Sequence, residues 1–340
     1  VTGVQTCALP ISAMAMGKSL EQQEADAICL ATMEAYYNAV YFDQLLKIVS
    51  AQVETSRLAL NLARRQEELG QKGYADIVQM EAELSDREYQ QITAENAYKS
   101  AMLTLKDLMF WPMDQELEID TSMAENAEIL DPEGNLVTDE IICNAQNLMP
   151  KAFIAKGEVA NAKRELMTAK WKMAPSLSIG GSISTGYYAY PGREGYTAIS
   201  FGHQFKNNLG EYIGVSLRIP IYGRLSGQSA ILRKKNAYKK AQTQYDQTMR
   251  EIETEVRRAV QDRDGASSAF LQANKRASVQ EEAYRLNSRK FEQGLISSIE
   301  LQNATNNYLN ARTERLNTLL KYYIKRSIVL YYNGISYLNQ

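Results

Sequence analysis

Apolar residues recur every three or four positions over most of the chain, which predicts long amphipathic helices. The first stretch runs from residue 13 to about residue 69 and contains no proline. A glycine turn at residues 70–73 separates it from a second stretch, which ends at Trp111-Pro112 because proline cannot continue a helix. Two further stretches, residues 225–293 and 295–332, flank Gly294 in the same way, with Gly265 a possible weak point in the longer one.

A fifth helix is predicted from Pro150 to residue 174. Its apolar side chains alternate at spacings of three and four residues, which is a heptad seam, and most of them are alanines that allow a partner helix to approach closely. Pro175 ends this helix. Two segments that follow show instead the two-residue alternation of β-strands, each expected to be about 12 residues long, enough to cross a bilayer at a tilt.

Each predicted strand has one apolar face and one small or polar face, because a one-residue step reverses the side of a strand. The apolar face consists of Leu177, Ile179, Ile183, Ile213, Val215, Leu217 and Ile219. The opposite face includes Ser178, Ser182, Ser216 and Arg218. The loop between the strands is rich in aromatic residues such as Tyr188 and Tyr196, as at a membrane interface. Alternation by itself fits half of a soluble antiparallel sheet equally well.

The chain contains an internal repeat at a shift of 224 residues, which takes Gly70 to Gly294 and Asp76 to Glu300. Both halves then share the same order: a long helix, a glycine turn, an acid six residues later and a return helix. The Pro150 helix and the strand pair have no counterpart in the first half. The repeat therefore predicts another helix, another strand pair and a signal peptide upstream of residue 1.

Composition excludes several classes of function. The 38 basic and 40 acidic residues give a net charge of −2, which argues against a nucleic-acid-binding protein. A single histidine, His203, and three cysteines without metal-ligand spacing leave almost no material for a metal site or a catalytic triad. No apolar run approaches the roughly 18 residues of a transmembrane helix. We therefore expect no enzyme activity, no metal and no cofactor.

Three local motifs stand out in the second half of the chain: residues 174–178 (APSLS), 215–222 (VSLRIPIY) and 291–304 (FEQGLISSIELQNA). They resemble the motifs of TolC-type outer-membrane efflux proteins. The resemblance covers residues 13–336 and implies a mainly α fold with a β-hairpin. In that family, long antiparallel helical hairpins form a periplasmic α-barrel, and the strands of three protomers form one transmembrane β-barrel. It further implies a location in the outer membrane of a Gram-negative bacterium, extending into the periplasm.

The resemblance also implies which residues act. The glycine turns become the periplasmic tip that closes the channel and docks a membrane-fusion (adaptor) protein, alongside an inner-membrane transporter. The tip residues are then Gly70, Gly73, Asp76, Phe291, Gly294, Ile296, Glu300 and Asn303. Ile296 and Asn303 replace charged residues of some members, which favours closure by packing at Phe291 and Ile296. Asp76 and Glu300 are equally well explained as acids at helix N-termini. The apolar strand face becomes lipid-facing and the polar face lumen-facing.

Six segments result. Residues 1–12 are expected to be non-native, because they resemble a translated sequencing-adapter oligonucleotide. The helical pair of the first repeat covers residues 13–110. Next comes an acidic equatorial segment, residues 111–149, with a turn at Asp131–Gly134. The second repeat follows as a helix at residues 150–174, a transmembrane hairpin with its extracellular loop at 175–222, and the long and return helices at 223–340.

Three functions fit these features. The leading one is the passive exit duct of a tripartite efflux pump that exports small molecules, built as a homotrimer in outer-membrane lipid. The second is the outer-membrane duct of a type I protein-secretion system. The third, from another class, is a soluble coiled-coil scaffold with a small sheet.

Overall fold

The computed structural model describes residues 2–70, 73–122, 137–190, 199–221, 223 and 225–337, with the backbone alone for residues 2–13 and 15. Gln71 and Lys72, the predicted turn at Asp131–Gly134, Tyr196 and Tyr222 lie outside these residues. The chain divides into two compact units, residues 1–14 with 155–245 and residues 15–154 with 246–340. None of the helices among the described residues is long and apolar enough to cross a membrane.

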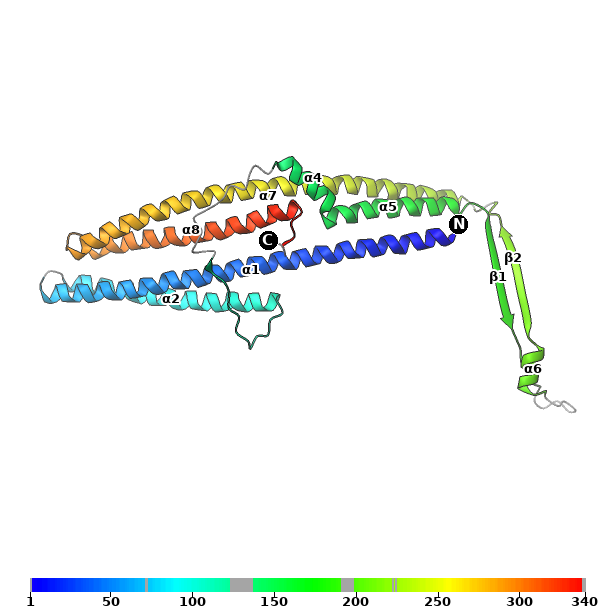
Figure 1. Ribbon diagram of the computed structural model, residues 1–340, viewed down its shortest axis with the longest axis horizontal. Helices are drawn as coiled ribbons and strands as arrows, with labels where there is room; N and C mark the ends of the chain where they lie inside the picture. Colours follow the sequence, from blue (N-terminus) through cyan, green and yellow to red (C-terminus); the bar gives the residue numbers. More distant parts are fainter. Residues whose placement is uncertain are drawn as a thin grey trace. The chain divides into compact units, whose positions relative to one another are not determined.

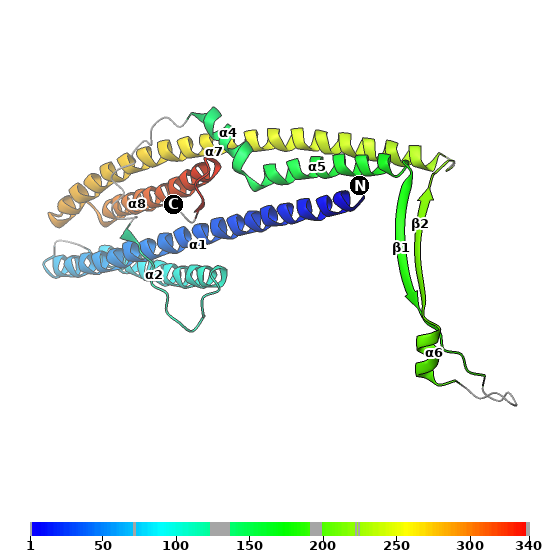
Figure 2. The ribbon, with the colours of Figure 1, turned by 45° about the vertical axis from the view of Figure 1, so that its right-hand side comes forward.

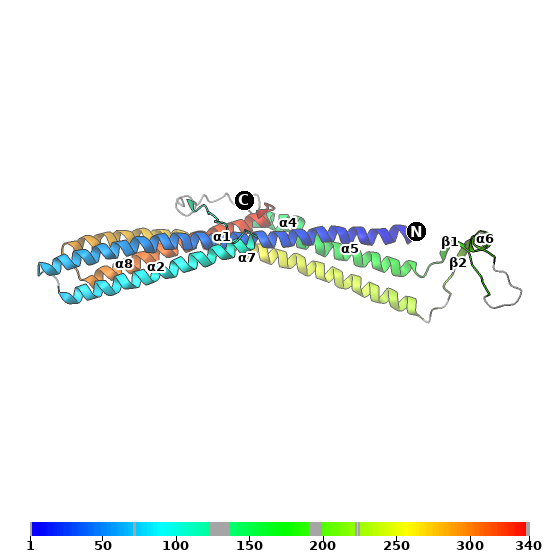
Figure 3. The same ribbon diagram turned by 90° about the horizontal axis from the view of Figure 1, so that it is seen from below.

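Two helical hairpins dominate the fold and repeat at the predicted shift. The first joins α1 (Thr2–Glu68) to α2 (Tyr74–Leu108), and the second joins α7 (Ser226–Glu292) to α8 (Ser298–Tyr332). Adding 224 to either bound of α1 and α2 gives the corresponding bound of α7 and α8. In Figures 1 and 3, α2 runs back along α1 and α8 runs back along α7. Gly265 does not interrupt α7, which is continuous through it.

The residues that follow α2 and α8 repeat as well. Phe110 (φ 52°) and Gly334 (φ 96°) both adopt the left-handed conformation. In each case the amide of the following residue donates a hydrogen bond to a carbonyl five residues earlier. The Trp111 amide donates to the Lys106 carbonyl, and the Ile335 amide donates to the Leu330 carbonyl. This Schellman geometry satisfies helix-end carbonyls and normally uses glycine. The first repeat uses phenylalanine at this position.

The unit made of residues 15–154 and 246–340 is held by apolar clusters that follow one another along its helices. One cluster lies at the glycine turns and joins α1, α2, α7 and α8 around Phe291 and Leu301. Others lie farther along, where Ala39 packs with Leu105 and Val40 packs with Leu316. Helices of heptad type bury one narrow seam each, so the core is long and thin.

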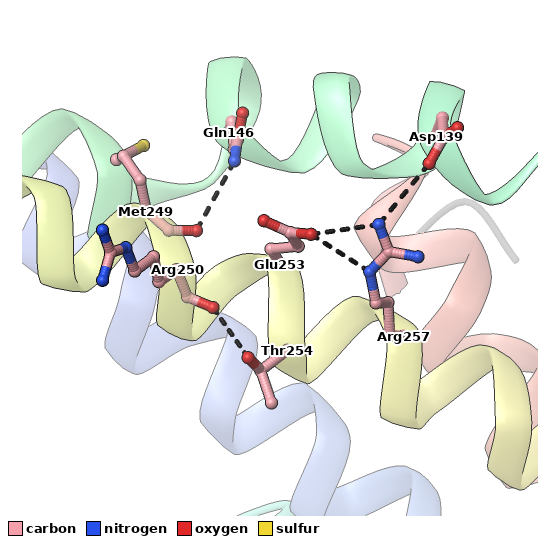
Figure 4. A network of polar contacts seen from close by, with 7 residues as sticks. All are labelled: Asp139, Gln146, Met249, Arg250, Glu253, Thr254 and Arg257. Carbon is pink, nitrogen blue, oxygen red and sulfur yellow. Dashed lines mark hydrogen bonds and ion pairs between the residues drawn. The ribbon is translucent and has the colours of Figure 1, made fainter.

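A short helix, α4 (Thr138–Leu148), lies within the acidic segment and packs on α7 and α8. Its apolar side chains, Ile141 among them, are buried against Val256 and Val329. Figure 4 shows the polar contacts above this core: Gln146 Nε2 donates to the Met249 carbonyl, and Arg257 bridges Glu253 and Asp139 at 3.0 and 3.7 Å.

In the other unit, α5 (Pro150–Trp171) leads into β1 (Ser176–Ser184), and β2 (Gly210–Arg218) leads into α7. The strands pair antiparallel, and the register sets Leu177 against Leu217 and Ser178 against Ser216. The apolar positions therefore share one face and the serines the other, as predicted. The apolar face ends at the loop, where Glu211 stands opposite Ile183. A short helix in that loop, α6 (Phe201–Asn207), was not predicted.

Two strand predictions were wrong. Each strand has nine residues and not about 12. Ile219, assigned to the apolar strand face, lies beyond the end of β2. The physical reason lies on the partner strand: the register pairs Ser176 with Arg218, so the next residue opposite Ile219 is Pro175, which has no N–H for the ladder.

Candidate functional site

The turns that join the two long helices to their return helices each begin with a glycine in the same backbone conformation. Gly70 (φ 69°) and Gly294 (φ 72°) are both left-handed, a conformation that glycine adopts without steric cost. The Gly294 amide donates to the Phe291 carbonyl at 2.9 Å and the Leu295 amide donates to the Lys290 carbonyl at 2.9 Å, which makes a Schellman end for α7. Gly73 differs, since it precedes α2 in an extended conformation with φ −89°.

The return helices begin differently. Ser297 caps α8 through a capping box, in which its Oγ accepts from the Glu300 amide and its own amide donates to Glu300 Oε2. Gly73 offers α2 no side-chain cap, and Asp76 stands in the first turn of that helix. Glu300 thus has a local role in starting α8, and Asp76 is available for another partner.

Asp76 is used to join the two repeats. Its Oδ1 accepts a hydrogen bond from Ser298 Oγ at 2.9 Å. Three more polar contacts follow along the two hairpins: Gln66 donates to the Glu292 carbonyl at 3.5 Å, Gln79 donates to Gln302 at 3.0 Å, and Arg87 donates to Asn306. The tip is therefore one structure built by both halves of the chain.

An apolar cluster lies under these contacts. Phe291 is 2% exposed and packs with Leu60, Ile77, Met80 and Leu301, while Ile296 is partly buried at its edge. Phe291 belongs to the buried core of this chain. Its part in closing the channel stays a prediction. Asn303 is exposed on α8.

The structure adds a buried ion pair that sequence reasoning missed. Arg87 lies 3.5 Å from Glu83 one turn away on α2, and their side chains are 6% and 8% exposed. Burial raises the pKa of Glu83, and the nearby guanidinium of Arg87 opposes that rise. The signal was present in the spacing, because Met80, Glu83, Arg87, Ala94 and Ala101 all occupy the seam of the helix.

A shallow groove of about 480 Å³ opens at the tip between Gln66, Asp76 and the second turn at residues 294–300. Its walls are turn backbone, hydroxyl, amide and carboxylate groups. Among the described residues no group of three His, Cys, Asp or Glu side chains stands close enough to hold a metal ion. His203 lies in α6 and contacts Asn207 at 3.3 Å. The groove at the tip thus combines polar groups with the apolar side chains of Leu295 and Ile296.

The strand residues assigned to lipid and lumen all lie on β1 and β2, except Ile219. On the apolar face, Ile179 is 75% exposed and its partner Val215 is 67% exposed. On the other face, Ser178 Oγ and Ser216 Oγ are 2.7 Å apart and hydrogen-bonded. An exposed apolar face on a two-stranded hairpin is unstable in water and needs either lipid or further chains.

Solved structures with the same fold are outer-membrane channels. The open-state MtrE outer membrane channel of Neisseria gonorrhoeae matches with a TM-score of 0.77 and 15% identity, over 97% of this chain and 70% of that one. The CmeC outer membrane channel of Campylobacter jejuni matches with a TM-score of 0.75 and 15% identity, over 97% of this chain and 67% of that one. The outer membrane protein VceC of Vibrio cholerae matches with a TM-score of 0.72 and 14% identity, over 96% of this chain and 74% of that one.

The fold is thus that of outer-membrane channels, mainly helical with a β-hairpin. The family model for outer membrane efflux proteins matches residues 150–327, which is more than half of the chain. The chain belongs to the outer membrane efflux protein family, whose members are transport channels and not enzymes. No curated protein sequence gives a significant match.

Proposed function

We propose that the protein is the outer-membrane exit duct of a tripartite efflux pump, which passively conducts small molecules from an inner-membrane transporter to the exterior. The observation that carries the proposal is the apolar hairpin face, which is exposed along β1 and β2 and joined covalently to α7, a helix of 67 residues. At 1.5 Å per residue such a helix is on the order of 100 Å long, a length suited to the space between two membranes.

In this proposal the protein is a homotrimer. The hairpin contributes to a shared β-barrel, with Leu177, Val215 and Leu217 toward lipid and Ser178, Ser216 and Arg218 toward the lumen. A closed barrel removes the unpaired strand edges and satisfies their backbone groups inside the bilayer. The helices surround a periplasmic duct, and energy comes from the partner transporter.

The glycine-turn tip is proposed to close the resting duct and to dock the periplasmic adaptor protein. Two glycine turns in one protomer give six in a trimer, an arrangement that suits a partner that repeats around the same axis. Gly70, Gly73 and Gly294 supply backbone accessible to the partner, and Phe291 and Ile296 hold the turn in place.

The test is complementation. The full-length gene is expressed in a Gram-negative strain that lacks its own outer-membrane channel but retains the cognate adaptor and transporter. Restored drug resistance, and cross-linking of the adaptor to a cysteine placed at Leu295, support an efflux duct. Secretion of a protein substrate without resistance indicates a type I secretion duct instead, and a chain extracted without detergent contradicts both.

A further inference from the structure

Positive charge is concentrated at the ends of α5 and α7 that adjoin the hairpin. Residues 159–172 carry four cations and one acid, Glu165, and residues 225–245 carry five cations and no acid. The chain as a whole has a net charge of −2, so this excess is local. In Figure 2 the two helix segments run side by side and continue into β1 and β2.

A groove of about 460 Å³ lies between these segments. Lys172, Arg233 and Lys234 line it together with Glu165. Glu165 is already paired, since Lys234 Nζ lies 2.7 Å from its Oε2. Arg233 donates to Ser229 Oγ at 2.7 Å, and among the described residues no acid pairs with Arg233 or Lys172. The groove therefore holds two cations without counter-ions.

The same groove has an apolar side. Met173, Ala169 and Ala230 line it, and the Met173 side chain lies directly over Gly227. Trp171, at the end of α5, is 53% exposed beside it. Tryptophan next to lysine, with an apolar surface below, is typical of the level at which headgroups meet acyl chains.

The position along the chain fits this chemistry. Lys172 precedes Ser176, the first residue of β1, by four residues, and Ser226 begins α7 soon after β2 ends at Arg218. If the strands cross the membrane as proposed, the groove lies at the periplasmic headgroup layer. Cations at that level are attracted to anionic lipids, at roughly a fivefold gain in affinity for each.

We propose that this groove binds the phosphodiester headgroup of an anionic phospholipid in the periplasmic leaflet of the outer membrane. Lys172 and Arg233 contact the phosphate, and Met173 and Ala230 contact the glycerol and the first methylenes. The inference rests on the proposed function, because it requires the hairpin to lie in the membrane. The bound headgroup would fix the depth in the membrane at which the strands of the barrel join α5 and α7.

The test uses the full-length protein in detergent, titrated with phosphatidylglycerol or phosphatidylcholine and observed by native mass spectrometry. The variant is Lys172→Gln with Arg233→Gln. The matched control is Arg258→Gln with Lys275→Gln, which removes two exposed cations of α7 far along the chain from the hairpin. Lys172→Arg with Arg233→Lys retains charge and tests whether shape matters.

We expect phosphatidylglycerol to bind more tightly than phosphatidylcholine, and the variant to lose roughly tenfold or more in this affinity. The control and the charge-retaining variant keep it. Equal affinity for both lipids, or equal losses in variant and control, overturns the proposal. Single-channel conductance of the same preparation is recorded separately, so a conducting protein without lipid preference contradicts this inference and leaves the proposed function intact.

Discussion

Gly70 and Gly294 stand 224 residues apart and adopt the same left-handed backbone conformation, with φ of 69° and 72°. A Cβ at either position would meet no atom within 4 Å. The requirement for glycine is therefore conformational and does not come from crowding. The two turns can thus be tested without disturbing the packing around them.

Gly70→Val and Gly294→Val should each destabilise the tip by about 1–2 kcal/mol, because a β-branched side chain disfavours positive φ. The expected result is loss of efflux in complementation with unchanged trimer levels. Gly265→Val is the matched control, since Gly265 lies inside α7, away from the turns, and a Cβ there would meet no atom within 4 Å. Efflux that survives both turn variants places adaptor docking elsewhere.

Phe110 occupies the position that Gly334 holds in the second repeat, and its side chain is 92% exposed. Phe110→Gly should therefore relieve backbone strain at almost no cost in packing, and raise stability by about 1 kcal/mol. Chemical denaturation measures the gain. Gly334→Ala is the reverse change and should destabilise, since its Cβ would stand 2.7 Å from Leu148 Cδ1. A less stable Phe110→Gly protein would mean that the aromatic ring makes a contact in the assembly.

Leu217 and Ser216 are neighbours on opposite faces of β2. A lysine at a lipid-facing site near the bilayer centre costs roughly 2–4 kcal/mol, whereas a lumen-facing site tolerates it. Leu217→Lys should therefore reduce the amount of heat-modifiable trimer on gels, and Ser216→Lys should leave it near the unsubstituted level. Equal levels for the two variants contradict the assignment of faces.

Arg87 and Arg57 form ion pairs of opposite kinds. The Arg87 pair with Glu83 is buried, and the Arg57 pair with Glu88 is about half exposed. Arg87→Ala leaves Glu83 buried without its partner and should cost about 3–5 kcal/mol. Arg57→Ala should cost less than about 1 kcal/mol. Denaturant unfolding of both variants makes the comparison, and similar losses would show that the tip opens to water.

Glu83 should also make stability depend on pH. Burial raises its pKa above the ordinary value of 4.5, so the folded state keeps this proton to a higher pH than the unfolded state does. Stability therefore falls as the pH rises from about 4.5 through the raised pKa. Glu83→Gln should remove that fall, and Glu81→Gln, at an exposed carboxylate of the same helix, should retain it. Unfolding free energies measured between pH 4.5 and 7 decide the matter.

Local pattern fixes much of this protein. The three-to-four spacing identified the long helices α1, α2, α5, α7 and α8 but not the short helices α4 and α6, and glycine identified both turns. Alternation placed Leu177 and Leu217 on one face of the hairpin, and the two residues are paired in the structure. Each of these properties depends on neighbours within one or two turns of the chain. The 224-residue repeat allowed the same local predictions in both halves of the chain, since similar local patterns give similar local backbones.

What the tertiary structure decided involves residues far apart in the sequence. The hydrogen bond from Ser298 to Asp76 depends on how two hairpins align along their lengths, and a seam of repeated apolar positions allows several alignments. The burial of Glu83 and Arg87 could not be predicted from the sequence, because charged side chains are normally exposed. It follows from the packing of this part of α2 against other helices. β2 ends at Arg218 because the next residue of the partner strand is Pro175, which has no N–H for the ladder, although the apolar pattern of β2 continues through Ile219. Periodicity shows which side of an element is buried, and only packing determines what it meets there.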